Sequence, residues 1–240
     1  MAHSEPPVGF DEQQAAGYDD RFAKISAVRD ALHLQLRAIL NVLPADARIL
    51  CVGAGTGAEL LTLATHFPQW HFTAVEPSAP MMKLCQRRMT EHGFAPRCIF
   101  HTGYIDSLPA SAPFHAATSL LVSHFITDRV ARQDYFRQIA SRLAPQGWLI
   151  TADLTGDQNA AEHAKLEDVW FRLMKFTGMT DEQRAGLFAA YRKDVAFLPP
   201  EEFAALVASA GFEPPTLFYQ ALLIRAWFTR RPLGAKGISA

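Results

Sequence analysis

The stretch RILCVGAGTGAELL, residues 48–61, places three glycines directly after a short apolar run. Gly53, Gly55 and Gly57 stand at alternate positions, and an apolar-rich helical pattern begins at Ala58. A buried strand that leads through a glycine turn into a helix lets a ligand approach the backbone, because no Cβ stands in the way. We therefore expect this stretch to form the first strand, turn and helix of a ligand site.

The loop alone does not decide which ligand it holds. The glycines read as G-x-G-x-G, Ala58 also completes the dinucleotide fingerprint G-x-G-x-x-A, and a tight turn without a ligand is the plainest alternative. Glu76 ends the next expected strand, 19 residues after Gly57, where an acid accepts hydrogen bonds from ribose hydroxyls. A solvated strand-end carboxylate is the alternative for Glu76. S-adenosylmethionine sites and NAD(P) or FAD sites both use such an acid.

Strand and helix patterns alternate from residue 49 to residue 152. We expect strands at 49–52, 71–75, 97–101, 116–122 and 148–152, and helices at 10–24, 27–42, 58–67, 80–92 and 128–143. Such alternation predicts βαβ units, with a parallel sheet and helices on both faces. Residues 158–198 then read as successive helices, and a further helix ends at Ala210. The β-rich segments 216–219 and 222–229 must pair antiparallel, because their link around Gln220-Ala221 holds no crossover helix.

These patterns predict an α/β fold: a doubly wound, Rossmann-like, seven-stranded sheet with an antiparallel last strand, N-terminal helices and a helical lid insert at about 158–198. Residues 1–9 are expected to be a flexible tail and residues 10–240 a single domain. Hydrophobic residues make up 49% of the 240 and charged residues 20%, the balance of a packed protein.

Composition also excludes several classes of partner. A formal net charge of −1 gives no basic footprint for nucleic acid or for an anionic membrane. No apolar run approaches the about 20 residues that span a bilayer, and the N-terminus has no signal-peptide core. The three cysteines show no metal spacing. We expect a cytoplasmic protein that uses neither a metal, nor a nucleic acid, nor a membrane.

Four motifs and the reversed last strand together resemble the class I S-adenosylmethionine-dependent methyltransferases. ILCVGAGTG (49–57) is similar to that family's first motif, AVEPSAPMM (74–82) to its second, HTGYIDSLP (101–109) to its third and FHAATSLLVSHFI (114–126) to its fourth. LAPQGWLITADL (143–154) resembles the segment that enters the fifth strand. A finer resemblance links FDE at 10–12, LVSHFI and the insert to the carboxy-S-adenosylmethionine synthases and nearby small-molecule methyltransferases.

The resemblance implies S-adenosylmethionine as the cofactor and a set of residues that bind it. Glu76 would hold the ribose, Met81 would lie near the adenine, and Tyr18 would fold over the cofactor from the N-terminal helices. The expected cofactor-binding residues are Tyr18, Gly53, Ala54, Gly55, Gly57, Glu76, Pro77, Met81, Tyr104, Ile105, Leu120 and Leu121.

Three positions depart from the family pattern. Cys51 stands at the place of the first-motif acid, Tyr104 stands where an Asp takes the adenine amino group, and His115 replaces the common Asp before the fourth strand. The Ile105 N–H and the Gly53 carbonyl would compensate for the first two losses.

Methyl transfer from a sulfonium needs an aligned nucleophile and in some cases a base, but no charged nucleophile on the protein. His124 follows the fourth strand and is the expected catalytic residue, because a base near pH 7 suits a phenol or another weakly acidic acceptor. A structural histidine that packs at the start of the next helix is the alternative.

The insert is expected to cover the carboxyl ends of the strands, either as a lid over an apolar acceptor pocket or as a homodimer surface. Its stripe of Leu166, Trp170 and Leu173 also suits plain helix packing. Arg184 and Arg192 are its candidates for binding an anion, because the carboxy-S-adenosylmethionine synthases use an arginine there.

We expect methyl transfer from S-adenosylmethionine to a small-molecule acceptor. Three alternatives stay open: remodelling of the cofactor, as in carboxy-S-adenosylmethionine synthesis; a non-catalytic protein that binds the cofactor, suggested by Cys51 and Tyr104; and a dinucleotide oxidoreductase, suggested by Ala58 and Glu76.

Overall fold

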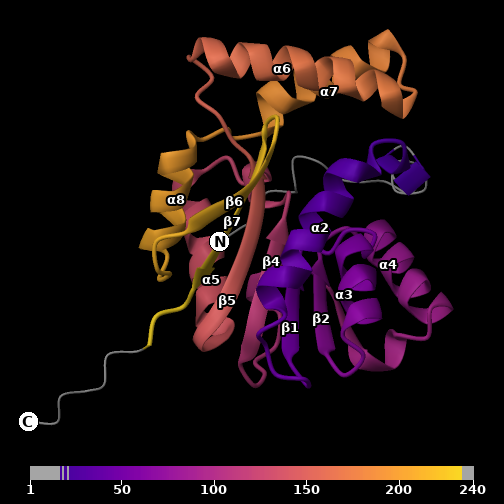
Figure 1. Ribbon diagram of the computed structural model, residues 1–240, viewed down its shortest axis with the longest axis vertical. Coiled ribbons are helices and arrows are strands. Elements are labelled where there is room, and N and C mark those ends of the chain that lie inside the picture. Colours follow the sequence, from indigo (N-terminus) through magenta and orange to yellow (C-terminus); the bar gives the residue numbers. More distant parts are fainter. Residues whose placement is uncertain (1–16, 18, 21, 234–240) are drawn as a thin grey trace, which may run out of the picture.

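The computed structural model describes residues 17, 19–20 and 22–233. Its centre is a seven-stranded sheet with the order β3-β2-β1-β4-β5-β7-β6 (Figure 1). The strands are β1 (Arg48–Val52), β2 (His71–Glu76), β3 (Cys98–Thr102), β4 (Phe114–Leu120), β5 (Leu143–Leu154), β6 (Thr216–Ala221) and β7 (Ile224–Arg230). The expected tail at 1–9, most of the expected helix at 10–24, and Tyr18 lie outside the described residues.

Pairing within the sheet has one reversed strand. β1 runs parallel to β2 and to β4, and β4 runs parallel to β5. β7 lies antiparallel between β5 and β6. The sheet is therefore doubly wound with an antiparallel last strand, as the sequence predicts.

Seven α-helices lie wholly within the described ranges. They are α2 (Ser26–Leu40), α3 (Ala58–His66), α4 (Ala79–Glu91), α5 (Arg129–Arg142), α6 (Ala161–Leu173), α7 (Asp181–Asp194) and α8 (Pro200–Ser209), with short 3-10 turns that include η3 (Ser123–Phe125) and η4 (Met174–Thr177). Of these, α4, α5 and α7 begin at side-chain caps. The Ser78 hydroxyl caps α4 by accepting from the Met81 N–H, and Asp128 caps α5 by accepting from the Ala131 N–H. Gly93, with φ of 74°, follows the end of α4.

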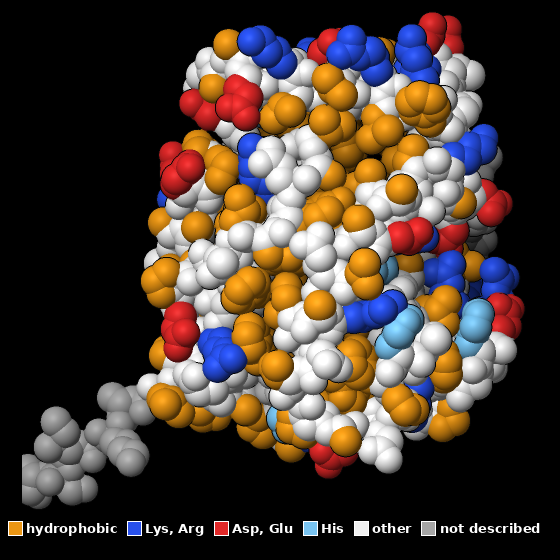
Figure 2. All heavy atoms as spheres, viewed as in Figure 1, with side chains coloured by type: hydrophobic (Ala, Val, Ile, Leu, Met, Phe, Trp, Pro, Cys, Tyr) orange, Lys and Arg blue, Asp and Glu red, His pale blue; other side chains and the backbone are white. Residues whose placement is uncertain are grey.

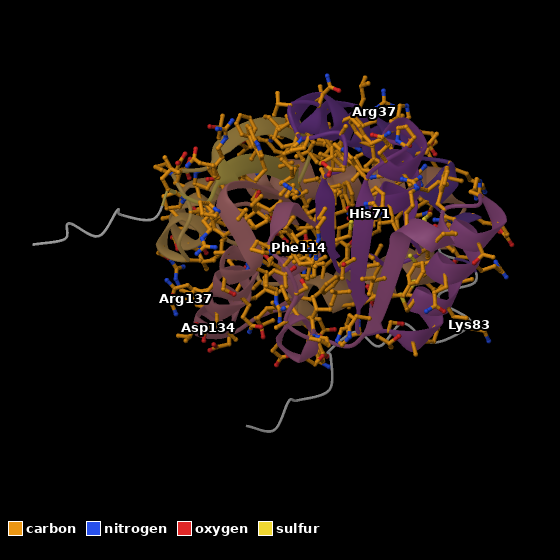
Figure 3. The ribbon with its side chains drawn as sticks, turned by 90° about the horizontal axis from the view of Figure 1, so that it is seen from below. Arg37, His71, Lys83, Phe114, Asp134 and Arg137 are labelled. Atoms are coloured by element: carbon orange, nitrogen blue, oxygen red, sulfur yellow. The ribbon has the colours of Figure 1, made fainter. Side chains whose placement is uncertain are left out.

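Helices cover both faces of the sheet (Figures 1 and 3). On one face α2, α3 and α4 pack Leu36, Leu60 and Met82 onto alternate strand residues such as Ile49 and Phe72. On the other face α5 and α8 bury their own set against the sheet, including Phe136, Ile139, Phe203 and Leu206. Figure 3 views the sheet from the edge opposite the insert, with His71 and Phe114 at the starts of β2 and β4.

Three boundaries differ clearly from expectation. β5 begins at Leu143, five residues before the expected start at 148, and ends at Leu154, two residues after the expected end at 152. β4 begins and ends two residues earlier than the expected 116–122, so Leu121 is not a strand residue. Leu121 instead adopts φ of 60°, a left-handed conformation that strains a residue with a side chain. The final hairpin turns at Leu222-Leu223, not around Gln220-Ala221, and Leu222 has φ of 55°. Leucine carries no turn signal in sequence, which explains the misplaced boundary.

The segment 158–198 contains α6, η4 and α7, which lie across the carboxyl ends of the strands (Figure 1). Trp170, Met174 and Phe188 from these helices form one apolar cluster with Leu154 and Ile224 from the ends of β5 and β7. In Figure 2, hydrophobic side chains gather between the insert and the sheet. Within the described ranges, no helix is long and apolar enough to cross a membrane.

Gly57 offers a test of the first turn. Its φ is +81°, and a Cβ placed on it would lie 2.7 Å from the Cys85 Sγ. Gly57→Ala is expected to lower the free energy of unfolding by about 2–3 kcal/mol, through left-handed strain and the contact with α4. Gly186→Ala is the control, because a Cβ in that exposed helical position meets nothing within 4 Å. Urea unfolding should show a slight gain for the control; equal losses in both variants would contradict the explanation.

Candidate functional site

The glycine loop is wound in left-handed backbone, with φ of 73° at Gly53, 54° at Gly55 and 81° at Gly57. The Gly53 and Ala54 N–H groups both donate to the Val75 carbonyl, at 2.8 and 3.1 Å, so the loop lies over the end of β2. A Cβ on Gly55 would meet nothing within 4 Å. Open space therefore faces this peptide, as a ligand that approaches the backbone requires.

Glu76 holds the loop from the neighbouring strand. Its Oε2 accepts from the Gly55 N–H at 2.9 Å, and its Oε1 accepts from the Ser78 N–H at 2.9 Å. Burial raises the pKa of this carboxyl, and the two backbone hydrogen bonds oppose the rise. A carboxylate has about four acceptor positions, so two stay available for a pair of ribose hydroxyls.

The other expected cofactor residues occupy the same edge of the sheet. Met81 is buried in the first turn of α4, whereas Pro77 beside it is exposed. The Gly103 N–H donates to the Glu76 carbonyl at 3.1 Å, which brings Tyr104 and Ile105 next to the loop. Ile105 is buried, and Tyr104 is 38% exposed, so its ring is accessible to a ligand.

Leu120 and Leu121 point to different parts of the molecule. Leu120 packs with the α2 side of the core, and Leu121 packs against the apolar cluster of the insert. Ala54 is buried within the first of these clusters. Together the loops after β1, β2, β3 and β4 therefore converge, although Tyr18 lies outside the described residues.

A buried acid that the sequence interpretation missed lies behind the loop. Glu59 on α3 is only 7% exposed, and its Oε1 accepts a 2.6 Å hydrogen bond from the Thr118 hydroxyl on β4. Thr118 is the register partner of Cys51 on β1, and the Cys51 thiol also bonds to Glu59. The acid missing at position 51 is thus present two residues after the last glycine, on α3 instead of β1.

Burial raises the pKa of Glu59 to about 7. The thiols of Cys51 and Cys85 also have raised pKa values, chiefly because they are buried, so the nearby groups are neutral near pH 7. Glu59 carries no ion pair with any described residue. An uncompensated carboxylate of this kind is costly to ionise in the folded protein.

His124 forms a pair with Asp153 at the carboxyl ends of β4 and β5. Its Nδ1 lies 2.7 Å from Asp153 Oδ1, and its backbone N–H donates to the same oxygen at 2.9 Å. His124 is 2% exposed and Asp153 is fully buried. A carboxylate at Nδ1 fixes the tautomer with the proton on Nδ1, which leaves the lone pair on Nε2.

The Nε2 atom of His124 has no hydrogen-bond partner among the described residues, yet it is not fully buried from solvent. Fully buried side-chain atoms without partners occur, in the part of the chain that the structure describes, only in Arg132, Thr151, His163, Trp170 and Arg184. The small exposed part of the ring therefore includes Nε2, the atom that a general base would use.

The other oxygen of Asp153 is also satisfied. Its Oδ2 accepts from the Ser123 hydroxyl at 2.6 Å, and that hydroxyl accepts from Arg132 Nε at 2.9 Å. Arg132 NH1 donates to the Ala196 carbonyl at 2.9 Å, and the Ala196 N–H donates to the His124 carbonyl at 2.8 Å. The end of the insert is thereby fixed beside the histidine.

The two arginines of the insert do not form an anion site in this structure. Arg184 is 5% exposed, donates to the Met179 carbonyl at 3.1 Å and pairs with Asp181. Arg192 lies 3.6 Å from Glu167, with most of its side chain in solvent. Arg184 is therefore paired within the insert, and its binding of an external anion stays a prediction.

Comparison with known proteins agrees with this geometry. Residues 49–147 match the family model described as a methyltransferase domain. A carboxy-S-adenosyl-L-methionine synthase from Campylobacter hominis is 27% identical over 145 residues, which cover 60% of either chain. The chain therefore has the Rossmann-like fold of the class I S-adenosylmethionine-dependent methyltransferases, and residues 49–147 resemble their methyltransferase domain.

Solved structures with the same fold include O-methyltransferases. An O-methyltransferase family protein from Burkholderia thailandensis aligns with a TM-score of 0.65 at 13% identity, over 93% of this chain and 61% of that one. An O-methyltransferase family 2 protein from Planctomyces limnophilus, in complex with apigenin, aligns with a TM-score of 0.59 at 17% identity, over 92% and 61%. This chain spans about three fifths of the length of such relatives, and at these identities the likeness to the solved structures concerns the fold.

The cofactor of this methyltransferase family is S-adenosylmethionine, and the loop fits it. Gly55 leaves the backbone open to a ligand, and the Glu76 carboxylate beside it retains two acceptor positions.

The ribose assignment can be tested at Glu76. We expect Glu76→Gln to weaken the binding of S-adenosylhomocysteine by about 10- to 100-fold, because it removes charge-assisted hydrogen bonds to the ribose. Calorimetric titration measures this, with Glu202→Gln on exposed α8 as the control. Unchanged affinity would contradict the ribose assignment.

Glu59 predicts a pH-dependent stability. Its pKa is about 7 in the folded protein against an ordinary value of 4.5, so folding favours the protonated form, and stability is lost as the pH rises through this interval. Glu59→Gln should therefore gain roughly 2–3 kcal/mol relative to the parent protein between about pH 5 and pH 8. Denaturant unfolding at both pH values checks this, and the exposed Glu91→Gln should show no such change. If the free energy of unfolding had the same pH dependence in Glu59→Gln and in the parent protein, this role of Glu59 would be refuted.

Proposed function

We propose that this protein transfers the methyl group of S-adenosylmethionine to a hydroxyl of a small, largely apolar acceptor, with His124 as the general base. The observation that carries the proposal is the His124–Asp153 pair, 2.7 Å apart, at the edge of the sheet that also holds the glycine loop. An imidazole whose other nitrogen is fixed by a buried carboxylate is suited to accept a proton at Nε2.

The residues divide the work of one displacement. When bound, S-adenosylmethionine would supply a methyl group attached to a sulfonium sulfur, and this sulfur would be the leaving group as a neutral thioether. His124 Nε2 takes the proton of the acceptor hydroxyl while the oxygen of that hydroxyl bonds to the methyl carbon and the carbon–sulfur bond breaks. Asp153 stabilises the resulting imidazolium and keeps the ring oriented. The insert excludes water from the edge where Leu121 and Phe125 meet its apolar cluster.

The chemistry of the acceptor follows from the surroundings of the base. Aromatic side chains are frequent in the insert cluster, with Phe125, Phe171, Phe188 and Tyr191 among them. An apolar, aromatic surround favours an apolar acceptor, and a base is useful for a hydroxyl that is weakly acidic, such as a phenol. The fold relatives described as O-methyltransferases, one of them in complex with apigenin, support a hydroxyl acceptor.

A second candidate is remodelling of the cofactor, which the 27% identity to a carboxy-S-adenosyl-L-methionine synthase favours. That activity would require a cation to hold the added carboxylate, and Arg184 is already paired with Asp181. Mass spectrometry of the cofactor that co-purifies with the protein separates the candidates: a modified S-adenosylmethionine would favour remodelling, and unmodified cofactor or S-adenosylhomocysteine would favour methyl transfer.

The base assignment predicts a split between turnover and binding. His124→Gln is expected to lower kcat by about 10²- to 10⁴-fold on a panel of phenolic acceptors, with release of S-adenosylhomocysteine as the readout. Its affinity for S-adenosylhomocysteine should stay close to that of the parent, since the cofactor loop is untouched. His71→Gln, at the opposite edge of the sheet (Figure 3), should keep full turnover. Full turnover in His124→Gln would refute the role, and no turnover by the parent protein with any acceptor would favour a non-catalytic binding protein.

A further inference from the structure

The described residues before α2 form a strap, which we define as residues 17, 19–20 and 22–25. Figure 1 shows this indigo segment between the insert and the helices α3 and α4. Asp19 is its contact to the cofactor loop, because Asp19 Oδ1 accepts a 2.8 Å hydrogen bond from the Thr56 hydroxyl. Thr56 lies between Gly55 and Gly57 and is 4% exposed.

Arg88 on α4 completes this contact. Its NH1 donates to the Thr56 carbonyl at 2.8 Å and to the Thr56 hydroxyl at 3.2 Å, and its NH2 pairs with Asp19. Three segments that are distant in sequence are therefore tied through one threonine. We call Asp19, Thr56 and Arg88 the clasp.

The clasp restrains the backbone at Thr56, where the two flanking glycines restrain it least. Thr56 is flanked by two glycines with positive φ, and glycine restrains the backbone less than any other residue. Side-chain and carbonyl contacts at Thr56 are therefore what fix the orientation of the peptides that face the cofactor. Glu76 holds the loop at Gly55 from β2, and the clasp holds it from the strap and α4.

Beside the clasp, the described residues of the strap border a cavity on one side and an apolar cluster on the other. The cavity has a volume of about 300 Å³, and its lining includes Asp19, Asp20 and Ala23 of the strap and Ala58, Leu61 and Arg88. On the other side of the strap, Phe22 and Ile25 pack against the apolar cluster of the insert. The clasp is also partly open to solvent, since the Arg88 and Asp19 side chains are 23% and 32% exposed.

We propose that Asp19 and Arg88 are positioning residues that lock the strap onto the glycine loop and thereby set the rate at which the cofactor or its product leaves. The charged pair must separate before the strap lifts, and Thr56 then loses its hydrogen bond to Asp19 while it keeps those from Arg88. The proposal needs only the cofactor, so release of S-adenosylhomocysteine tests it independently of methyl transfer and of the acceptor.

The test is a chase of radiolabelled S-adenosylhomocysteine from the full chain with an unlabelled excess. Asp19→Asn is expected to raise the dissociation rate constant by about 5- to 20-fold, the range for a part-exposed, charge-assisted contact. The matched control is Asp20→Asn, an exposed neighbour in the same strap. A second pair is Arg88→Gln against Arg87→Gln, whose parent side chain is 68% exposed and pairs with Glu91.

Two further readouts distinguish positioning from a general loss of stability. In the parent protein the dissociation rate should rise with added salt, because the Asp19–Arg88 pair is screened, and this dependence should be absent in Asp19→Asn. Thr56→Ser keeps the hydroxyl and should retain slow release, whereas Thr56→Val should release as fast as Asp19→Asn. Equal rates in Asp19→Asn and Asp20→Asn, or equal salt dependence in parent and Asp19→Asn, would overturn the proposal.

Discussion

The reversal of strand order between β1 and β4 is the constraint on which the site depends. The chain leaves β1 toward one face of the sheet, as α3, and leaves β4 toward the other face, where α5 packs. The two connections therefore diverge at the carboxyl edge, at the switch point where open α/β sheets bind ligands. Gly55 follows the strand on one side of this switch point and His124 follows the strand on the other. Cofactor loop and candidate base are neighbours because of this topology, although about 70 residues separate them in sequence.

Two buried acids lie near this switch point, and they differ in whether a positive charge compensates them. Asp153 is fully buried and bonded to Ser123 and His124 of η3 and to Arg132 of α5, so its charge is compensated from two segments. Glu59 has hydrogen bonds from Thr118 and from a thiol but no ion pair with any described residue, and burial raises its pKa. A buried ion network adds little net stability compared with apolar packing. The value of the Asp153 network is therefore orientation: it fixes the imidazole, the start of α5 and the end of the insert together.

The sequence predicted the sheet because its signals were local. Apolar runs, the glycine turn and the caps at Ser78 and Asp128 each act within a few residues, so strands and helices fell close to their observed bounds. The loop, Glu76 and His124 were recognisable for the same reason. Asp153 was not, since it reads as one polar residue at the end of a strand and gains its role only from pairing β4 with β5. The roles of Glu59 and of the clasp could not be predicted from the sequence. The Glu59–Thr118 contact spans 59 positions and the Asp19–Arg88 contact spans 69, and such long separations form no local motif.

The strap and the insert both lie over the carboxyl edge of the sheet, and they contact each other through one apolar cluster. Phe22 and Ile25 of the strap pack into the same apolar cluster as Trp170 and Phe188 of the insert. The strap is also bound to the glycine loop through Asp19. Lifting the strap would therefore remove contacts from the cofactor loop and from the cover of the acceptor side in one movement. Exclusion of water from the reacting groups then depends on the strap together with the insert, and loss of the cover on the acceptor side is coupled to release of the spent cofactor.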